Sequence, residues 1–162
     1  MKEIVILCVE DEPEVRDALR RDLQHFEEVF QIECAEDSDD AHEILKECEE
    51  RAQRIGLILC DHVLPGKTGV DFMADLSADA RFEDVPKVLV TGQAGHQDTI
   101  RAINEANLQH YIAKPWDAED LKAVVHEQLT DFVIAVGVDV MPYVATLDGA
   151  RLLESMKTDY TD

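Results

Sequence analysis

The sequence lacks a long hydrophobic run, a surplus of basic residues and a recognisable cysteine pattern. No apolar stretch reaches the roughly 18 residues of a membrane span, and the N-terminal residues do not have the layout of a signal peptide. The 4 cysteines are scattered, without the spacing of a metal site or a disulfide framework. We therefore expect a cytoplasmic protein that holds reduced thiols in its core and does not contact a membrane.

Acidic residues far outnumber basic ones. The chain carries 36 aspartate and glutamate residues against 15 lysine and arginine residues, which gives a net charge of −21. Such a chain would repel a nucleic-acid backbone unless it had a basic face, so we expect no direct binding to DNA or RNA. A strongly acidic surface favours the binding of divalent cations and of basic partner proteins. The alternative is that the negative charge only keeps the protein soluble.

Short β-rich runs alternate with amphipathic helical stretches, which is the pattern of an α/β fold with a parallel sheet. Five strands are expected, near residues 4–9, 30–35, 57–60, 88–90 and 111–113, and the alternating second run is expected at a sheet edge. Five helices are expected between and after them, the first from Pro13, the second capped by Asp37 and the last from Asp117. No internal repeat or low-complexity linker divides the chain.

Charged side chains stand where three of these strands end. Glu10 and Asp11 follow the first strand, Asp61 follows the third, and Lys114 follows the fifth. In an open parallel sheet the carboxyl ends of the strands face one crevice, which is where such folds bind ligands. Three carboxylates and one ammonium group should therefore converge there. This combination indicates metal-assisted phosphate chemistry.

The strand-end motifs together resemble the receiver domain of two-component response regulators (CheY-like), over residues 1–130. The resemblance implies a flavodoxin-like, doubly wound, five-stranded parallel sheet in the order 2-1-3-4-5, with helices on both faces. It is specific because the motifs match in order, spacing and position. They are Glu10-Asp11, Asp61 with Leu64-Pro65-Gly66 and Gly69, Thr91-Gly92, and Lys114-Pro115.

The resemblance implies a regulatory phosphoacceptor that promotes only its own phosphorylation and dephosphorylation. Asp61 would take a phosphoryl group from the phosphohistidine of a sensor histidine kinase or a phosphotransfer protein. Lys114 and Thr91 would contact phosphoryl oxygens, and Thr91 with Tyr111 would form the switch that alters a protein-interaction surface. That surface is expected around residues 94–106 and 111–121, where a downstream protein target would bind.

The resemblance also implies a Mg²⁺ ion, for which Mn²⁺ can substitute. Asp11 and Asp61 would bind it directly, Glu10 directly or through water, and Val63 through its backbone carbonyl. Glu10 stands where the family more often has aspartate, so its extra methylene can change the water structure around the metal. Val63 occupies a position that is often polar and that influences how fast phosphate is lost.

Other functions fit the sequence less well. A flavodoxin needs a neutral phosphate-binding loop after the first strand, and a haloacid-dehalogenase-type phosphatase needs an aspartate where Val63 stands. A receiver-like module that is never phosphorylated remains an alternative. A second alternative is the receiver portion of a longer protein with a separate output domain. An output through protein contact is favoured, because no DNA-binding or nucleotide-binding motif follows residue 130.

Residues 131–162 should form a C-terminal helical extension. The apolar stripe of the last receiver helix continues through Phe132, Val133 and Val136, until Gly137 and Pro142 interrupt it. A sheet of this size cannot cover the distal part of that helix, so these side chains should be exposed in a lone domain. We favour a homodimer that buries them through residues 118–162. The alternative is that the second amphipathic stretch folds back over the first.

Overall fold

The computed structural model describes residues 2–92 and 96–160, apart from the side chains of residues 96, 98, 102 and 158–160. It contains a five-stranded parallel sheet in the order β2-β1-β3-β4-β5, which confirms the predicted topology. The strands are β1 (Ile4–Val9), β2 (Gln31–Ala35), β3 (Arg54–Cys60), β4 (Lys87–Thr91) and β5 (His110–Ala113). Strand β2 lies at an edge, as its alternating sequence predicts. The segment 93–95, which includes the start of the predicted interaction surface, lies outside the described residues.

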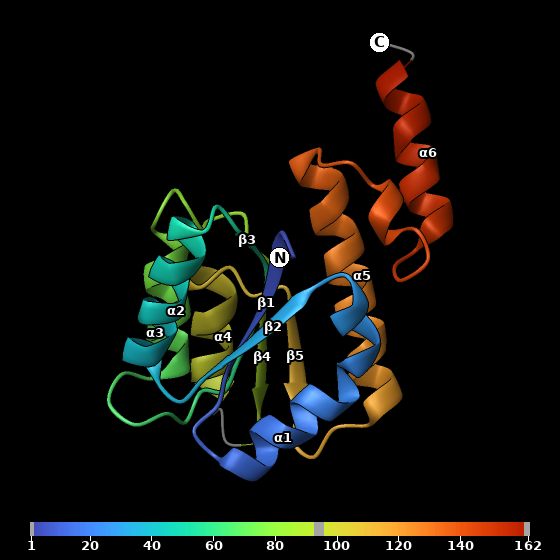
Figure 1. The fold of residues 1–162 in the computed structure, drawn as a ribbon. Helices are drawn as coiled ribbons and strands as arrows, with labels where there is room; N and C mark the ends of the chain where they lie inside the picture. The colour runs from blue at the N-terminus through green and yellow to red at the C-terminus, as the bar shows by residue number, and fades with distance from the viewer. Residues whose placement is uncertain (1, 93–95, 161–162) are drawn as a thin grey trace.

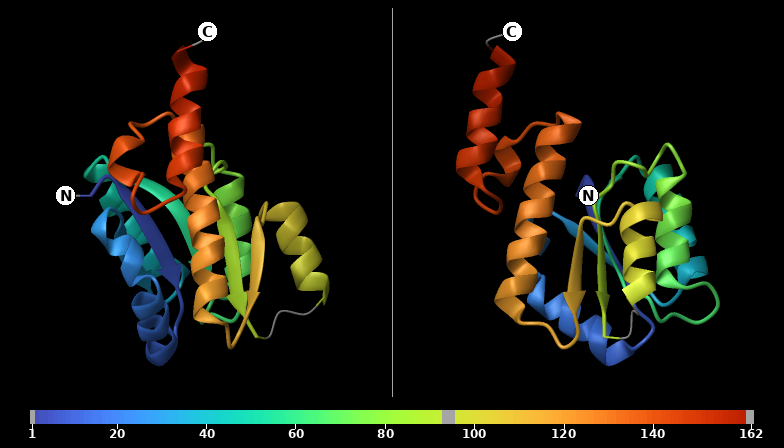
Figure 2. Two further views of the ribbon diagram at one scale, coloured as in Figure 1. Left: turned by 90° about the vertical axis from the view of Figure 1, so that its right-hand side faces the viewer. Right: turned by 180° about the vertical axis from the view of Figure 1, so that it is seen from behind.

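Helices cover both faces of the sheet (Figures 1 and 2). The helices α1 (Pro13–Asp22) and α5 (Ala118–Val136) lie on one face, and α2 (Ser38–Glu50), α3 (Gly69–Ser77) and α4 (His96–Glu105) lie on the other. Successive residues of β1 alternate between the two cores because side chains alternate along a strand. Ile4, Ile6 and Cys8 pack toward α1 and α5, whereas Val5, Leu7 and Val9 pack toward α2 and α3.

Local signals set where several helices begin. Pro13 occupies the first turn of α1, where its missing N–H is not needed. The Asp37 carboxylate accepts a hydrogen bond from Asp40 N at 2.8 Å, so the predicted cap of α2 is confirmed. Thr68 caps α3 in the same way through Asp71 N, at 3.2 Å. In the described part of the chain, no helix is long and apolar enough to cross a membrane.

The C-terminal extension folds back against α5. Helix α5 continues to Val136 and ends at Gly137, whose left-handed φ of 72° suits glycine. The chain then turns through a short 3₁₀ helix, η2 (Met141–Tyr143), into α6 (Gly149–Tyr160). Tyr143 stacks on Phe30 with ring centroids 5.3 Å apart, which fastens the returning segment to the main core.

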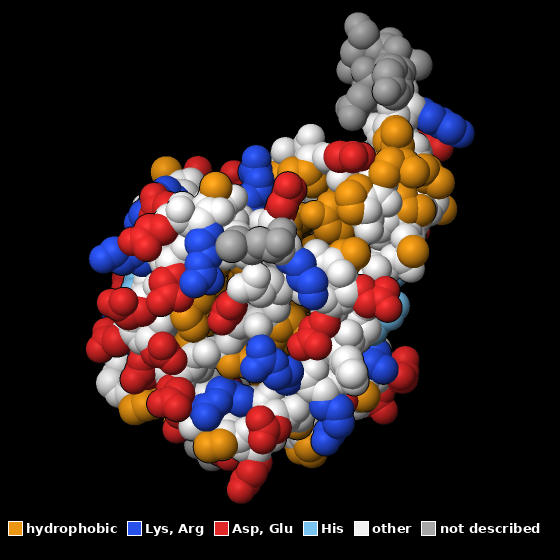
Figure 3. All heavy atoms as spheres, in the orientation of Figure 1, with side chains coloured by type: hydrophobic (Ala, Val, Ile, Leu, Met, Phe, Trp, Pro, Cys, Tyr) orange, Lys and Arg blue, Asp and Glu red, His pale blue; other side chains and the backbone are white. Residues whose placement is uncertain are grey.

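This arrangement corrects the expectation that the distal part of α5 is exposed. Phe132 is 6% exposed and Val133 is fully buried within a single chain, while Val136 is partly buried. The Phe132 ring packs on Gly56 of β3, where a Cβ would lie 3.3 Å from it. The core that contains Phe132 and Val133 also includes side chains of the returning segment, namely Val140, Tyr143, Leu147 and Leu152. The expectation was wrong for Phe132 and Val133 because it placed the limit of the sheet too early and left the returning segment out. Figure 1 shows α6 projecting away from the domain, and Figure 3 shows hydrophobic side chains over the same region.

We predict that the returning segment is part of the cooperative fold. Tyr143→Ala removes a ring that is 5% exposed and stacked on Phe30, and it should lower the free energy of unfolding by about 3 kcal/mol. Met141→Ala is the control, because Met141 lies in the same 3₁₀ helix but is 54% exposed, and its effect should stay within about 0.5 kcal/mol. Urea unfolding measures both changes. Equal effects would show that the segment is not integrated into the core.

Candidate functional site

The predicted carboxylates meet at the carboxyl ends of β1 and β3. Val9 and Cys60 are paired in the register of these neighbouring strands, so Glu10 and Asp61 emerge beside each other. Glu10, Asp11 and Asp61 each present an oxygen, and these atoms all lie within 4.8 Å of one another. Glu10 and Asp61 are buried, at 1% and 4% exposure, whereas Asp11 faces solvent.

Lys114 reaches this cluster from the end of β5. Its Nζ donates to Glu10 Oε2 at 2.6 Å and to Asp61 Oδ2 at 2.9 Å. The ammonium group therefore bridges the two buried carboxylates, which are 104 and 53 residues away from it in sequence. A lysine between two carboxylates attracts both of them and offsets part of their mutual repulsion.

Thr91 and Tyr111 form a chain of hydrogen bonds that leads away from Asp61. Thr91, at the end of β4, is 1% exposed, and its side chain hydrogen-bonds the Asp61 carboxylate. The Tyr111 hydroxyl donates to the Thr91 backbone carbonyl at 3.0 Å. Thr91 and Tyr111 lie on adjacent strands, since the register of β4 and β5 pairs Leu89 with Tyr111. The two predicted switch residues are thus in direct contact.

The loop between β3 and α3 holds Asp61 in place. Val63 N donates to Asp61 Oδ1 at 3.3 Å, while the Val63 side chain is 48% exposed. Gly69 packs so closely behind Asp61 that a Cβ there would lie 1.8 Å from the Asp61 carbonyl oxygen. Only glycine permits this approach, which explains the glycine in the predicted motif.

Arg16 is part of the site, although the sequence analysis did not identify it. Its guanidinium donates to the backbone carbonyls of Glu10 at 2.9 Å and of Asp11 at 3.1 Å. Arg16 lies in the first half of α1 and fixes the turn that carries both carboxylates. No sequence signal separated Arg16 from the other charged residues of that helix, because its hydrogen bonds at the site go to backbone carbonyls.

The electrostatics of the site reflect a surplus of negative charge. Burial raises the pKa of Glu10 to about 7, together with repulsion from Asp61, despite the hydrogen bond from Lys114. Burial also acts to raise the pKa of Asp61, but hydrogen bonds from Thr91 and Lys114 outweigh it and lower that pKa below its usual value. The pKa of Lys114 is raised because its two carboxylate partners outweigh its burial.

The residues present fit a hard divalent cation. Glu10, Asp11 and Asp61 offer carboxylate oxygens, which are the ligands that Mg²⁺ prefers, and Asp11 stands at the solvent side where water can complete the shell. With all groups ionised, three carboxylates and one ammonium leave a charge of −2 in the cluster. A divalent cation would balance that charge.

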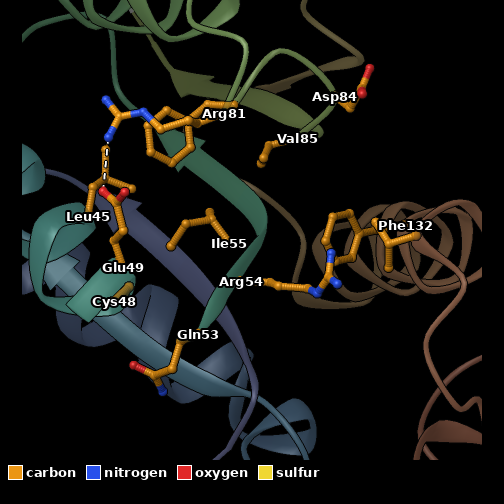
Figure 4. A pocket seen from close by; sticks show the side chains of 12 residues that line it. Leu45, Cys48, Glu49, Gln53, Arg54, Ile55, Arg81, Asp84, Val85 and Phe132 are labelled. Atoms are coloured by element: carbon orange, nitrogen blue, oxygen red, sulfur yellow. Dashed lines mark hydrogen bonds and ion pairs between the residues drawn. The ribbon is translucent and has the colours of Figure 1, made fainter. Parts of the chain in front are cut away.

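A separate cavity of about 340 Å³ lies at the opposite end of the strands, near the start of β3 (Figure 4). It opens between α2, the start of β3, the segment before β4 and the end of α5. Its walls are mainly apolar, with Ile55, Val85 and Phe132, and Arg81 pairs with Glu49 at 2.9 Å on its rim. None of the predicted site residues lines it, so the carboxylate cluster remains the candidate site.

Comparisons with known proteins identify relatives of this chain. The chain is 32% identical over 126 residues to the hydrogenase transcriptional regulatory protein HoxA of Cupriavidus necator, covering 78% of this chain and 24% of HoxA. It is 34% identical over 118 residues to the phosphate regulon transcriptional regulatory protein PhoB of Escherichia coli, covering 73% of this chain and 48% of PhoB. The chain thus spans between about a quarter and about half of these relatives.

Solved structures show the same fold. A CheY-like response regulator receiver domain protein from Methanospirillum hungatei superposes with a TM-score of 0.68 at 23% identity, covering 79% of this chain and 94% of that one. The receiver domain of a signal transduction histidine kinase from Syntrophus aciditrophicus gives 0.66 at 25% identity, with 78% and 90% covered. The family model described as response regulator receiver domain matches residues 6–126. With most of its length matched, the chain belongs to the response regulator receiver domain family.

Proposed function

We propose that the chain accepts a phosphoryl group on Asp61 and thereby switches a protein-interaction surface. Receiver domains are a family of regulatory phosphoacceptors. The observation that carries the proposal is that Asp61 receives hydrogen bonds from both Lys114 and Thr91 inside a carboxylate cluster suited to Mg²⁺. The alternative of a receiver that is never phosphorylated is disfavoured, because each group that the chemistry needs is present and in contact.

The donor would be the phosphohistidine of a sensor histidine kinase or a phosphotransfer protein. An Asp61 oxygen attacks phosphorus, the P–N bond breaks, and its electron pair returns to the imidazole nitrogen. The product is an acyl phosphate. The lowered pKa of Asp61 keeps its carboxylate ionised and able to attack. Charge neutralisation at the phosphoryl oxygens is what Mg²⁺, or Mn²⁺ in its place, supplies when bound by Glu10, Asp11, Asp61 and the Val63 carbonyl.

Lys114 and Thr91 would exchange their partner when the phosphoryl group arrives. The Lys114 ammonium now lies between Glu10 and Asp61, within reach of the position that a phosphoryl oxygen would take. Phosphorylated Asp61 would present that oxygen to Lys114 and another to the Thr91 hydroxyl. A movement of Thr91 would displace Tyr111, because the Tyr111 hydroxyl donates a hydrogen bond to the Thr91 carbonyl.

The signal would be read at the β5 edge of the sheet. A shallow cavity of about 490 Å³ lies there, lined by residues of β5 and the start of α5, including Tyr111, Trp116 and Val124. Residues 96–106, which comprise α4 and Ala106, together with residues 111–121 would form the contact surface for a downstream protein. We assign the phosphoacceptor role to residues 1–130 and treat residues 131–162 as its helical extension, in a cytoplasmic protein that contacts neither membrane nor nucleic acid itself.

The output can also lie in another domain. HoxA and PhoB are transcriptional regulators that extend well beyond the matched region. By analogy, the chain would be the regulatory portion of a longer protein, or would act on a separate protein. Both arrangements use the same β5-edge surface, and the receiver chemistry is identical in each.

We predict that Asp61 is the sole phosphorylation site. Acetyl phosphate with Mg²⁺ should produce one base-labile adduct, detected by intact-protein mass spectrometry, and Asp61→Asn should abolish it. Asp17→Asn makes the same change at an exposed position of α1 and should leave labelling intact. Labelling of Asp61→Asn to the wild-type extent would overturn the assignment.

We predict that Mg²⁺ stabilises the protein through the carboxylate cluster. A metal concentration one hundred times the Kd should add about 2.7 kcal/mol to the free energy of unfolding. Asp11→Asn should remove most of this gain and leave the metal-free protein no less stable, since it removes one of the crowded negative charges. Glu12→Gln, one residue away and exposed, is the matched control and should keep the metal response. Thermal melts with and without Mg²⁺ decide between these outcomes, and a less stable metal-free Asp11→Asn protein would contradict the repulsion argument.

We predict that the Tyr111 hydroxyl carries the signal to the β5 edge. NMR shifts induced by the phosphate mimic beryllofluoride should concentrate in residues 96–106 and 111–121. Tyr111→Phe removes the bond to the Thr91 carbonyl and should confine the shifts to the phosphate pocket. Tyr143→Phe, a tyrosine far from that bond, should leave the wild-type pattern. Shifts centred on α2 in the wild-type protein would refute this route.

A further inference from the structure

Two of the four cysteines are neighbours in the sheet. Cys8 of β1 and Cys34 of β2 are paired in the register of these strands. Both side chains lie on the face of the sheet that α1 and α5 cover, since Cys8 belongs to the core on that side and Cys34 packs against it. Cys48 and Cys60 lie in the separate core on the other face. All four thiols are free, so the sheet places one pair of free thiols side by side.

The spacing of the strands allows a bond between these two thiols. Neighbouring strands lie about 4.8 Å apart, and disulfides join residues whose Cα atoms are about 4.4 to 6.8 Å apart. A hydrogen bond with the Cys8 thiol is already the largest influence on the pKa of Cys34. The two sulfur atoms are therefore close together in the reduced protein.

Cys34 is the more reactive of the two thiols because it lies at the edge of the sheet beside two arginines. It is partly exposed, whereas Cys8 is fully buried. Arg20 of α1 donates to a backbone carbonyl of β2 at 2.9 Å, which holds its guanidinium next to the strand that carries Cys34.

The surroundings of Cys34 favour its ionised form. The hydrogen bond from the Cys8 thiol lowers the pKa of Cys34 to about 7. The charges of Arg20 and Arg16 act in the same direction, whereas burial and the charge of Glu33 oppose them. A partly exposed thiol that ionises near neutral pH, with a second thiol beside it, is typical of cysteines that react with oxidants.

We propose that Cys8 and Cys34 are a redox-reactive pair that hydrogen peroxide converts into a disulfide. The Cys34 thiolate attacks one peroxide oxygen, the O–O bond breaks, and the other oxygen leaves as hydroxide and takes up a proton to give water. Cys34 is then a sulfenic acid. The Cys8 sulfur attacks the Cys34 sulfur, the S–O bond breaks, and the departing hydroxide leaves as water with the Cys8 proton. The two sulfurs together lose two electrons, and the two peroxide oxygens gain them.

The disulfide would be transient in a reducing compartment, where cellular thiols reduce it and restore the pair. It would link β1 to the edge strand β2 two residues before Glu10. The proposal goes beyond the phosphoacceptor function and does not depend on it.

Peroxide treatment of the whole native chain, followed by mass spectrometry, tests the proposal. After a stoichiometric dose of hydrogen peroxide, the remaining thiols are blocked with N-ethylmaleimide in denaturant. The wild-type protein should lose the mass of two hydrogen atoms, and only two of its four cysteines should be blocked. Cys8 and Cys34 lie on separate tryptic peptides, residues 3–16 and 22–46, so the bond should join these two peptides until a reductant is added.

Three variants separate the roles of the thiols. Cys34→Ser removes the attacking thiol at a partly exposed position and should abolish the bond. Cys8→Ala should stop the reaction at the sulfenic acid of Cys34, which dimedone traps. Cys48→Ala is the matched control and should form the bond as the wild type does, because Cys48 lies in the other core and burial raises its pKa. Circular dichroism checks that each variant is folded.

Arg20→Gln should slow the loss of the Cys34 thiol by about threefold at about pH 6, which is the effect of half a unit in the pKa of that thiol. Arg21→Gln, on the same helix and 73% exposed, should keep the wild-type rate.

A wild-type chain that keeps four free thiols after peroxide treatment would overturn the proposal. So would a bond that involves Cys48 or Cys60, or the wild-type loss of mass in Cys34→Ser. The wild-type measurement needs no substitution, so it is decisive even where a variant fails to fold.

Discussion

The bridge from Lys114 to Glu10 and Asp61 is the interaction on which the site depends. Two buried carboxylates at neighbouring strand ends would repel each other strongly in a low-dielectric environment. The ammonium group lowers that repulsion without removing it, because its single charge faces three negative ones. The site is therefore stable enough to fold and still has a strong preference for further positive charge. Under the proposed function, that balance would let a divalent cation and a phosphoryl group share the pocket, since the charge of one offsets the charge of the other.

The sheet supplies the geometry that this interaction requires. Parallel strands place their carboxyl ends on the same side of the sheet. β1 and β3 are neighbours although the crossover through α1, β2 and α2 lies between them in the sequence, so that Val9 and Cys60 pair across 51 positions. Strand β5 lies two positions from β3, so Lys114 spans β4 to reach Asp61, and Thr91 fills the place between them. The order of the strands thus decides which side chain meets which.

Much of the fold and site could be predicted because both depend on local signals. Apolar runs predict the strands, Asp37 and Pro13 mark helix starts, and residues directly after parallel strands must lie at one edge. The contact between Glu10 and Asp61 follows from the strand order. Arg16 was missed because its hydrogen bonds go to backbone carbonyls, and such partners leave no pattern in a sequence.

The C-terminal extension shows where local signals stop being informative. The stripe through Phe132 and Val133 correctly predicts a longer helix but does not reveal what covers it. The cover depends on the turn at Gly137 and on the stacking of Tyr143 on Phe30, a contact between residues more than a hundred positions apart. Whether a stripe is covered by its own chain or by another is a three-dimensional question. Phe132 and Val133 are covered by side chains of their own chain.

Helix α5 runs the full height of the domain. Its 19 residues span about 28 Å, from the Asp117 cap near the phosphate end to Gly137 beside the extension. The helix packs on the sheet along its middle, so a rigid tilt about that middle would move its two ends in opposite directions. A tilt of 5° about the centre would shift each end by about 1.2 Å, since half the length of the helix is about 14 Å. The two ends of the molecule are mechanically joined by one continuous helix.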